Sequence, residues 1–370
     1  MNIVFLTYLN INYPGGGHRV FYPLATKLAN LGHTVRVIST DNGESTTNIA
    51  SLLSEKGIDV DTMPTLHRTT VPRDISFLRD SFRRCDVVYM QYWPRGMEFS
   101  ALMCSWVTGT PVIAAHYGHL TNAKYDSRLV SHISERILGP RNIKIGKHFK
   151  LHHVICKNDY LDVTRYVTPT KVVFLPLGVQ NNSFKKRDKF KTFTLFMLSR
   201  LVEDKGILLL PFLMKGIQAK IPSFRLYVAG SGNLESFVAN MAKADDRIIF
   251  LGEITEETKR DMLEQSHVLL APSSYESFML TGVEAMSAYT PVIIFDIPGP
   301  RDYIRDGHNG FIARDVSDFA SKIIELFDMW KNDSKSYEVM LANCRKTAEK
   351  YDWDNSVMPA FERMLQRSFE

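Results

Sequence analysis

Short apolar runs rich in β-branched residues alternate with amphipathic helical patterns along the 370 residues, and the alternation begins again half-way. In the first half we expect strands at 3–8, 34–40, 87–91, 112–116, 153–156 and 171–175, with helices such as 19–31 and 127–138 between them. Strands that lack strict polar–apolar alternation and are separated by helices are buried on both faces. The pattern therefore predicts a parallel sheet covered by helices.

The second half repeats this order, with strands expected at 193–199, 225–229, 248–251, 268–271 and 292–295, and helices at 206–219, 234–244, 256–265 and 281–289. A polar, basic stretch at 180–191 between the halves is typical of an interdomain linker. We predict an α/β protein of two Rossmann-like doubly wound domains facing a central cleft. The domains are residues 1–180, to which a helix at about 355–370 returns, and residues 181–354. Ligands of such sheets bind at the carboxyl ends of the strands.

The charge and the cysteines narrow the function classes. A net charge of +5 favours anionic ligands but is too small to indicate nucleic acid by itself. The four cysteines form no CxxC pair and have no zinc-ligand spacing, which indicates a reducing compartment. Residues 1–8 are typical of a first strand rather than a signal peptide, and no apolar run reaches the roughly 20 residues that span a bilayer. We expect a cytoplasmic protein, or one peripheral on the inner face of a membrane.

The most informative motif lies between the expected strands 268–271 and 292–295. Glu276 falls in the loop and Glu284 inside the following helix, and the amides of Phe278, Met279 and Leu280 fall at the helix N-terminus. Free helix N-terminal amides suit a phosphate. At 1.5 Å per residue the two carboxylates are about 12 Å apart, which matches a sugar and a ribose joined by a diphosphate. The alternative is two surface glutamates on an ordinary helix.

Two cations follow the first strand of the second half. Arg200 and Lys205 lie five residues apart, before a helix that opens at Gly206. Both can turn toward one diphosphate, and arginine can do so with two parallel hydrogen bonds. They would neutralise the charge of a leaving group. The alternative is a solvated basic turn paired with Glu203 and Asp204.

Glycine turns and one histidine complete the candidate set. Gly230 and Gly232 form a turn after a strand, which is either a close approach to a ligand or a tight connection. Gly16 and Gly17 belong to a second glycine-rich loop at a helix N-terminus, where they can contact a diphosphate. His116 ends the strand 112–116, so it lies at the ligand-binding edge or has a structural role.

Taken together, these residues resemble the retaining glycosyltransferases of the two-domain B-type fold in glycosyltransferase family four. The resemblance covers nearly the whole chain and rests on the Glu-x7-Glu pair Glu276 and Glu284, on Arg200 and Lys205, and on His116 with the N-terminal glycine loop. It implies metal-independent transfer with retention of configuration and no cofactor. It also implies a front-face displacement in which the departing phosphate deprotonates the acceptor.

The resemblance also implies a role for each matching residue. Glu284 would bind the donor ribose, Glu276 the sugar hydroxyls, and His116 the sugar near its 6-hydroxyl. The catalytic set is His116, Arg200, Lys205 and Glu276, and the donor-binding set is Gly16, Gly17, Gly230, Phe278, Met279, Leu280 and Glu284. The chain departs from the family pattern at Ser277, at Tyr289 and at Asp302, so its sugar and base pockets are expected to be unusual.

We expect a UDP- or GDP-hexose as donor and a glycan or lipid-linked acceptor. A basic stretch at 124–150, with Lys147 and Lys150 near its end, fits an anionic membrane surface or a solvated face, and no nucleic-acid motif accompanies it. Two further readings stay open: a non-catalytic glycosyltransferase-like partner protein, and a nucleotide-sugar epimerase on the same fold.

Two Asp-x-Asp pairs offer a different chemistry, because such pairs hold a metal and a diphosphate in A-type glycosyltransferases. They are Asp59 with Asp61, and Asp352 with Asp354. Neither follows a core strand of the expected sheets. We interpret all four as surface acids and expect no metal site.

Overall fold

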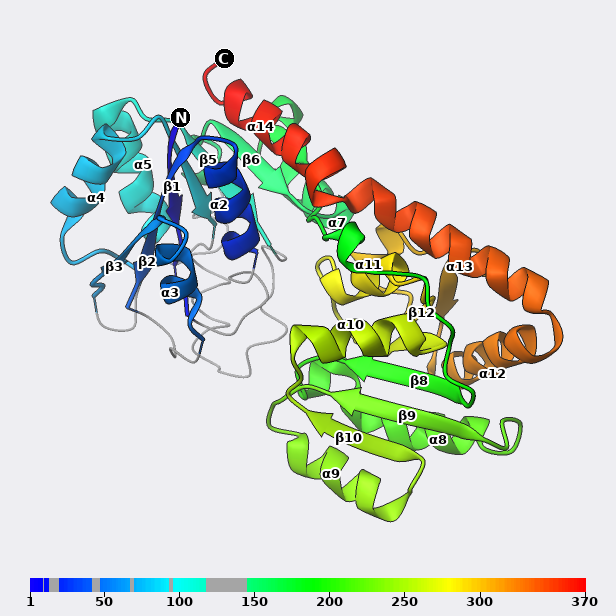
Figure 1. Ribbon diagram of the computed structural model, residues 1–370. Coiled ribbons are helices and arrows are strands. Elements are labelled where there is room, and N and C mark those ends of the chain that lie inside the picture. The colour runs from blue at the N-terminus through cyan, green and yellow to red at the C-terminus, as the bar shows by residue number, and fades with distance from the viewer. Residues whose placement is uncertain (9, 13–19, 42–46, 67–69, 93–95, 118–144) are drawn as a thin grey trace. The chain divides into compact units, whose positions relative to one another are not determined.

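The computed structural model describes residues 1–8, 10–12, 20–41, 47–66, 70–92, 96–117 and 145–370. The chain forms two compact units, one of Met1–Pro176 with Met358–Glu370 and one of Leu177–Val357 (Figure 1). The division falls a few residues from the boundaries expected from the sequence, because Val179 pairs with the end of the second unit. Its N–H donates to Tyr351 O at 2.8 Å, and its carbonyl accepts from the Trp353 N–H at 3.0 Å.

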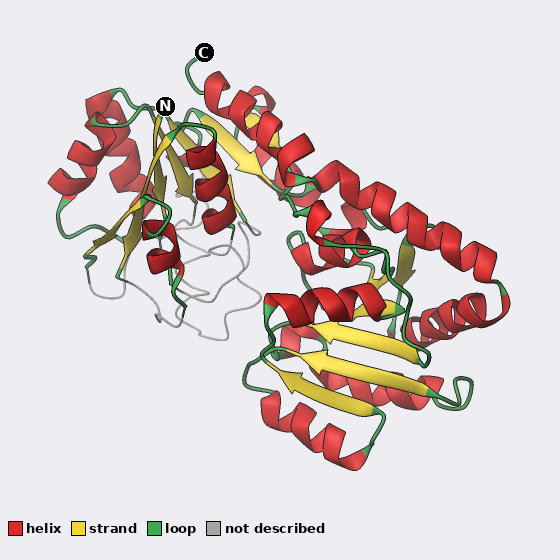
Figure 2. Ribbon diagram, viewed as in Figure 1, coloured by secondary structure: helices red, strands yellow, loops and turns green. Residues whose placement is uncertain are grey.

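The described residues of the first unit form a seven-stranded parallel sheet in the order β3-β2-β1-β4-β5-β6-β7. Figure 2 shows strands in yellow and helices in red in both units. The strands are β1 (Asn2–Leu6), β2 (Thr34–Thr40), β3 (Asp59–Met63), β4 (Val87–Gln91), β5 (Val112–His116), β6 (Leu151–Val154) and β7 (Val172–Phe174). The helices are α2 (Phe21–Asn30), α3 (Ile49–Ser54), α4 (Ile75–Arg83), α5 (Met97–Thr108), α7 (Lys157–Thr164) and α14 (Met358–Arg367). The chain order reverses between β1 and β4, which places a ligand-binding position at their carboxyl ends.

The second unit contains a six-stranded parallel sheet in the order β10-β9-β8-β11-β12-β13. Its strands are β8 (Phe193–Leu198), β9 (Phe224–Ala229), β10 (Ile248–Gly252), β11 (Val268–Ala271), β12 (Val292–Phe295) and β13 (Gly310–Ala313). Its helices are α8 (Leu210–Ile217), α9 (Glu235–Ala244), α10 (Glu256–Gln265), α11 (Leu280–Ser287), α12 (Val316–Asn332) and α13 (Ser334–Ala348). The order reverses between β8 and β11, so the loops that follow these two strands lie at the position where open sheets bind ligands.

The predicted α/β fold with two doubly wound sheets is confirmed, and β2, β4, β5, β11, β12 and α10 have the predicted ends. The strand β3 was missed because Asp59 and Asp61 interrupt its apolar pattern at the edge of the sheet. The helices α12 and α13 were also not predicted, and the expected helix 127–138 lies outside the described residues. The cleft expected between the domains stays a prediction.

The stretch 180–191 is not a linker, which corrects the sequence prediction. Asn181 is buried and donates from Nδ2 to Ala348 O at 2.9 Å. Lys189 donates from Nζ to Thr290 Oγ1 at 2.6 Å and to Glu264 O at 3.0 Å. The polar side chains therefore satisfy backbone and side-chain groups of the second unit, and the stretch belongs to that unit.

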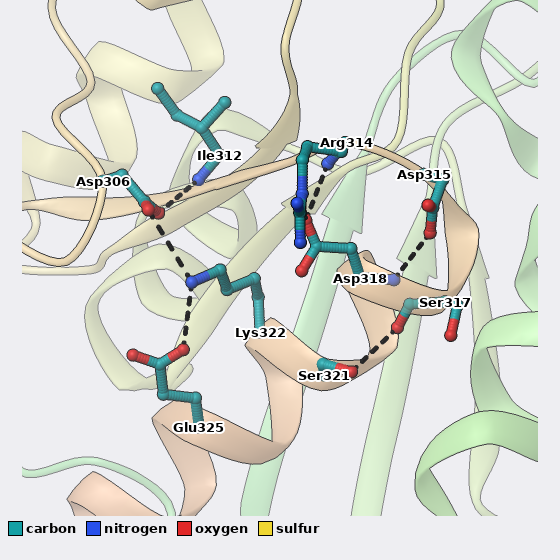
Figure 3. Close-up of polar contacts among 9 residues, drawn as sticks. All are labelled: Asp306, Ile312, Arg314, Asp315, Ser317, Asp318, Ser321, Lys322 and Glu325. Carbon is teal, nitrogen blue, oxygen red and sulfur yellow. Dashed lines mark hydrogen bonds and ion pairs between the residues drawn. The ribbon is translucent and has the colours of Figure 1, made fainter.

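The helix α12 begins at a side-chain cap (Figure 3). Asp315 accepts at Oδ1 from the Asp318 N–H at 2.8 Å, which is an N-cap bond. One turn further, the Lys322 ammonium lies 3.1 Å from Glu325 Oε2 and 3.7 Å from Asp306 Oδ2. Lys322 thus ties the helix to the turn before β13 (Figure 3).

The helix α14 completes the core of the first unit, although the whole second unit, Leu177–Val357, separates it in sequence from that unit's sheet. The ring of Phe361 is fully buried, 5.1 Å from the ring of Tyr89 and 6.1 Å from that of His153. These two partners are joined by a 2.6 Å hydrogen bond between Tyr89 Oη and His153 Nδ1. In the described ranges no helix is both long and apolar enough to cross a bilayer.

Candidate functional site

The loops after β8 and β11 bring together two of the predicted residues. Lys205 Nζ lies 2.8 Å from Glu276 Oε1, and Ser273 Oγ donates to the same oxygen at 2.9 Å. Only 13% of the Lys205 side chain and 16% of the Glu276 side chain are exposed. The close approach depends on Gly206 (φ +73°), because a Cβ there would stand 2.0 Å from Pro272 O.

Arg200 differs from Lys205 in its surroundings. It is exposed in the loop after β8, and among the described residues no acid forms an ion pair with its guanidinium. Lys205 pairs with Glu276 and not with Glu203 or Asp204, so the proposed local pairing of the basic turn is wrong for Lys205. An exposed guanidinium with no acidic partner among the described residues is available to an anionic ligand.

The loop before α11 leads into the N-terminus of the helix, where three backbone N–H groups have no acceptor among the described residues. Met279 has φ +63° and is held by Tyr303, whose hydroxyl donates to Met279 O at 2.9 Å. In the described parts of the chain, the N–H groups of Phe278, Met279 and Leu280 donate to no protein acceptor. The loop lies so close to Gly299 (φ +85°) that a Cβ there would stand 2.6 Å from two loop carbonyls. The tip is therefore a rigid group of free amides.

Glu284 lies on α11, where its carboxylate has a partner that the sequence did not reveal. Lys259 Nζ on α10 lies 2.8 Å from Glu284 Oε1 and 2.6 Å from Glu256 Oε2. The spacing from Glu256 to Lys259 is a visible i,i+3 signal, but the contact with Glu284 depends on helix packing. Because α11 begins only at Leu280, the part of the chain next to Glu276 is not helical, and the 12 Å separation computed for a continuous helix does not apply.

The turn of Gly230 and Gly232 is required by the packing of backbones. A Cβ at Gly230 would stand 1.8 Å from Ser199 O, and one at Gly232 would stand 2.4 Å from Leu201 O. Leu201 N also donates to Ser231 O at 2.8 Å. These contacts explain both glycines without a ligand and hold the start of the Arg200 loop in place, so a role in donor binding stays a prediction.

His116 ends β5 in a buried hydrogen-bonded chain. His152 Nε2 lies 2.9 Å from Gly146 O, and His152 Nδ1 lies 2.9 Å from His116 Nε2. Burial lowers the pKa of His152 to about 4 and that of His116 well below its usual value, so both rings are neutral at pH 7. A carbonyl only accepts, so His152 carries its proton on Nε2 and His116 carries its proton on its own Nε2. His116 Nδ1 is then a buried acceptor, and it has no partner among the described residues.

Some of the other predicted positions lie outside the described residues, and one has a different role from the one expected. Gly16 and Gly17 lie outside the described residues, as does the basic stretch up to residue 144. Asp352 is buried and accepts from the N–H groups of Asp354 and Asn355, so it is a turn cap and not the surface acid that we expected.

Comparison with known proteins shows what the unit that carries the Lys205–Glu276 pair is similar to. Residues 179–347 match the profile of the family described as Glycosyl transferases group 1. Most of the second unit is thus similar to this family. The match begins at Val179, at the start of this unit, and includes both loops at the chain reversal of its sheet.

Individual relatives agree with this family. The poly(ribitol-phosphate) alpha-N-acetylglucosaminyltransferase of Staphylococcus aureus is 31% identical over 163 residues, which are 43% of this chain and 32% of that protein. The phosphatidyl-myo-inositol mannosyltransferase of Mycobacterium leprae is 26% identical over 200 residues, which are 51% of this chain and 53% of that protein. The chain thus spans 32% of the length of the first of these relatives and 53% of the length of the second.

A solved structure extends the likeness to both units. The Anabaena protein HepE, crystallised in complex with UDP, matches with a TM-score of 0.79 at 15% identity, over 99% of each chain. At this identity the match shows the fold alone. It agrees with two parallel α/β units of the kind found in B-type glycosyltransferases.

Proposed function

We propose that this chain is a retaining glycosyltransferase that moves a hexose from a UDP- or GDP-sugar to a glycan or lipid-linked acceptor. The observation that carries the proposal is the Lys205–Glu276 pair beside the free amides of Phe278, Met279 and Leu280. The group 1 domain match and the UDP complex of HepE support the same donor class.

The donor contacts follow from the charges in the second unit. The amides at the tip of α11 and the guanidinium of Arg200, which have no acceptor among the described residues, bind the diphosphate. When the donor binds, the Lys205 ammonium turns toward the phosphates, and Glu276 is released to accept hydrogen bonds from sugar hydroxyls. Glu284 accepts a hydrogen bond from a ribose hydroxyl.

The chemical step needs no residue that forms a covalent intermediate. The bond between C1 of the sugar and the β-phosphate oxygen breaks, and a bond from C1 to the acceptor oxygen forms on the same face. The acceptor proton passes to the departing phosphate oxygen. Lys205, Arg200 and the helix amides stabilise the charge that develops on that phosphate, so we propose a metal-independent reaction without a cofactor.

The acceptor is proposed from the relatives. The names of two of them specify poly(ribitol-phosphate) and phosphatidyl-myo-inositol, one a polymer and one a lipid. We propose a glycan or lipid-linked acceptor, reached by a protein that is cytoplasmic or peripheral on an anionic membrane, with no nucleic acid as partner.

Thermal shift on the full chain tests the donor. UDP, GDP, ADP and the corresponding hexose conjugates are compared, because a ligand that binds only the folded state raises its stability. Products are then analysed with and without an acceptor. Transfer to the acceptor supports the proposal. Interconversion of the free donor would instead indicate an epimerase, and no shift with any of these probes contradicts the proposal.

Two variants test the site itself. We expect Lys205→Met and Glu276→Gln each to lower transfer about 100-fold, the scale of losing one charged transition-state contact. Lys215→Met, at an exposed lysine on α8, is the matched control and should retain full activity. Circular dichroism verifies folding, and full activity in both site variants would refute the assignment.

A further inference from the structure

A lysine that the proposed function does not use lies against the proposed ribose-binding carboxylate. Lys259 Nζ lies 2.8 Å from Glu284 Oε1 and 2.6 Å from Glu256 Oε2. The Lys259 side chain is 15% exposed and that of Glu284 20%, whereas Glu256 is 83% exposed. The inner pair is thus shielded, and the outer glutamate lies in solvent.

The charges make this contact persistent. Burial alone would lower the pKa of Lys259, but Glu284 and Glu256 outweigh burial and raise it. The lysine therefore stays protonated at neutral pH, and it donates to one particular oxygen of Glu284. In the parts of the chain that the structure describes, Glu284 Oε2 has no protein donor.

The two helices that carry this pair are fixed at other points. At the C-terminal end of α11, the Arg345 guanidinium donates to Ser287 O at 2.9 Å. At the start of α10, Thr255 Oγ1 accepts from the Thr258 N–H at 3.1 Å. With both backbones held, the main remaining freedom of Glu284 is rotation of its side chain, and the bond to Lys259 removes that freedom.

We propose that Lys259 is a positioning residue that holds Glu284 so that its second oxygen accepts a hydrogen bond from a ribose hydroxyl, giving the site its preference for ribonucleotides. This inference rests on the proposed function, in which Glu284 binds the donor ribose. Lys259 itself contacts neither the sugar nor the phosphates. Its effect is confined to the ribose end of the ligand.

The test compares ligands that differ only in their ribose hydroxyls. Calorimetry on the full chain measures UDP, GDP and ADP and their 2′,3′-dideoxy counterparts. For the nucleotide that binds, we expect the wild type to prefer the ribose form at least about tenfold, the effect of one good hydrogen bond to a charged group. In Lys259→Met this preference should fall below about threefold, because a freely rotating carboxylate no longer holds its oxygen at the hydroxyl.

Controls separate positioning from general stability. A merely structural role would weaken the ribose and dideoxy forms alike and leave their ratio unchanged. Lys243→Met, at an exposed lysine on α9, should leave both affinities as in the wild type. Glu284→Gln should remove the preference, and adding Lys259→Met to it should change the ratio no further. Lys259→Gln replaces the Met variant if that variant does not fold.

The possible results of this calorimetry distinguish failure of the proposed function from failure of the inference about Lys259. If the wild type binds none of the three nucleotides, the proposed function fails and this inference fails with it. If the wild type binds a nucleotide without preferring its ribose, nucleotide binding stands, but the roles of Glu284 and Lys259 are refuted. If the wild type prefers ribose and Lys259→Met keeps that preference, only the inference about Lys259 is overturned.

Discussion

Lys189 gives the second unit a stability that depends on pH in the alkaline range. Its side chain is partly buried, and its ammonium is enclosed by Glu264 O and Thr290 Oγ1. Burial lowers the pKa of Lys189 from 10.5 to about 7, although Cys344, Glu338 and Glu264 act in the opposite direction. The unfolded chain has no such burial, so its lysine keeps the ordinary pKa.

The sign and size of the pH effect on the free energy of unfolding follow from this difference in the pKa of Lys189. Between pH 7 and 10.5 the unfolded lysine holds a proton that the folded lysine has released, so the free energy of unfolding rises with pH. Below pH 7 both states are protonated, and the difference is constant. The full displacement corresponds to about 5 kcal/mol. Because the side chain keeps some contact with water, we expect about 2–3 kcal/mol of this to appear between pH 7 and 9.5.

Urea unfolding of wild type and Lys189→Met at half-unit steps from pH 6 to pH 10 measures the effect. The part of the tryptophan fluorescence that Trp330 contributes follows the second unit, since its ring lies 4.5 Å from that of His267 in this unit's core. The wild type should gain about 2–3 kcal/mol over the variant as pH rises from 7 to 9.5, because other titrating groups are common to both. Parallel curves, with a constant difference across this range, would refute the reasoning.

Three further perturbations follow from described contacts. Phe361→Ala should lower the free energy of unfolding of the first unit by about 3–5 kcal/mol in urea titrations, the usual cost of a large core cavity. Gly299→Ala should weaken nucleotide binding in calorimetry about tenfold, because its Cβ would stand 2.6 Å from Glu276 O. The control is Gly307→Ala, at φ +70° with nothing within 4 Å of the added Cβ, which should lower stability without changing nucleotide affinity. Equal nucleotide affinities in the two variants would contradict this account. Asp315→Ala should destabilise α12 by about 1 kcal/mol, and unchanged hydrogen exchange in that helix would contradict its role as cap.

Most of the fold could be predicted because the strands of doubly wound sheets are buried on both faces. The strand 268–271 is an uninterrupted apolar run, and its limits are those predicted. Strand β3 could not be found in the same way, because an edge strand need not be apolar and Asp59 and Asp61 alternate along it. The prediction of a linker at 180–191 was wrong for a related reason. Its composition is that of a solvated segment, but the partners of Asn181 and Lys189 are residues 75 to 167 positions away.

The candidate site was predicted in part. Chemical type and position after a strand were enough to single out Lys205 and Glu276, and the structure joins them. Lys259 and His152 could not be found, because each contacts a partner that only the packing of helices or strands brings near. No local pattern connects Lys259 to Glu284, 25 residues further on, or His152 to His116, 36 residues earlier.

The place of α14 affects how the chain acquires its structure during synthesis. The second unit is one continuous segment, Leu177–Val357, so all its core residues have been translated before the segment Met358–Glu370 exists. The first unit has its sheet early, but the buried ring that closes over Tyr89 and His153 arrives only with Phe361. A chain translated only to residue 357 therefore contains every residue of the second unit but lacks part of the core of the first unit. A stop codon near residue 357 would thus damage the unit farther away in sequence.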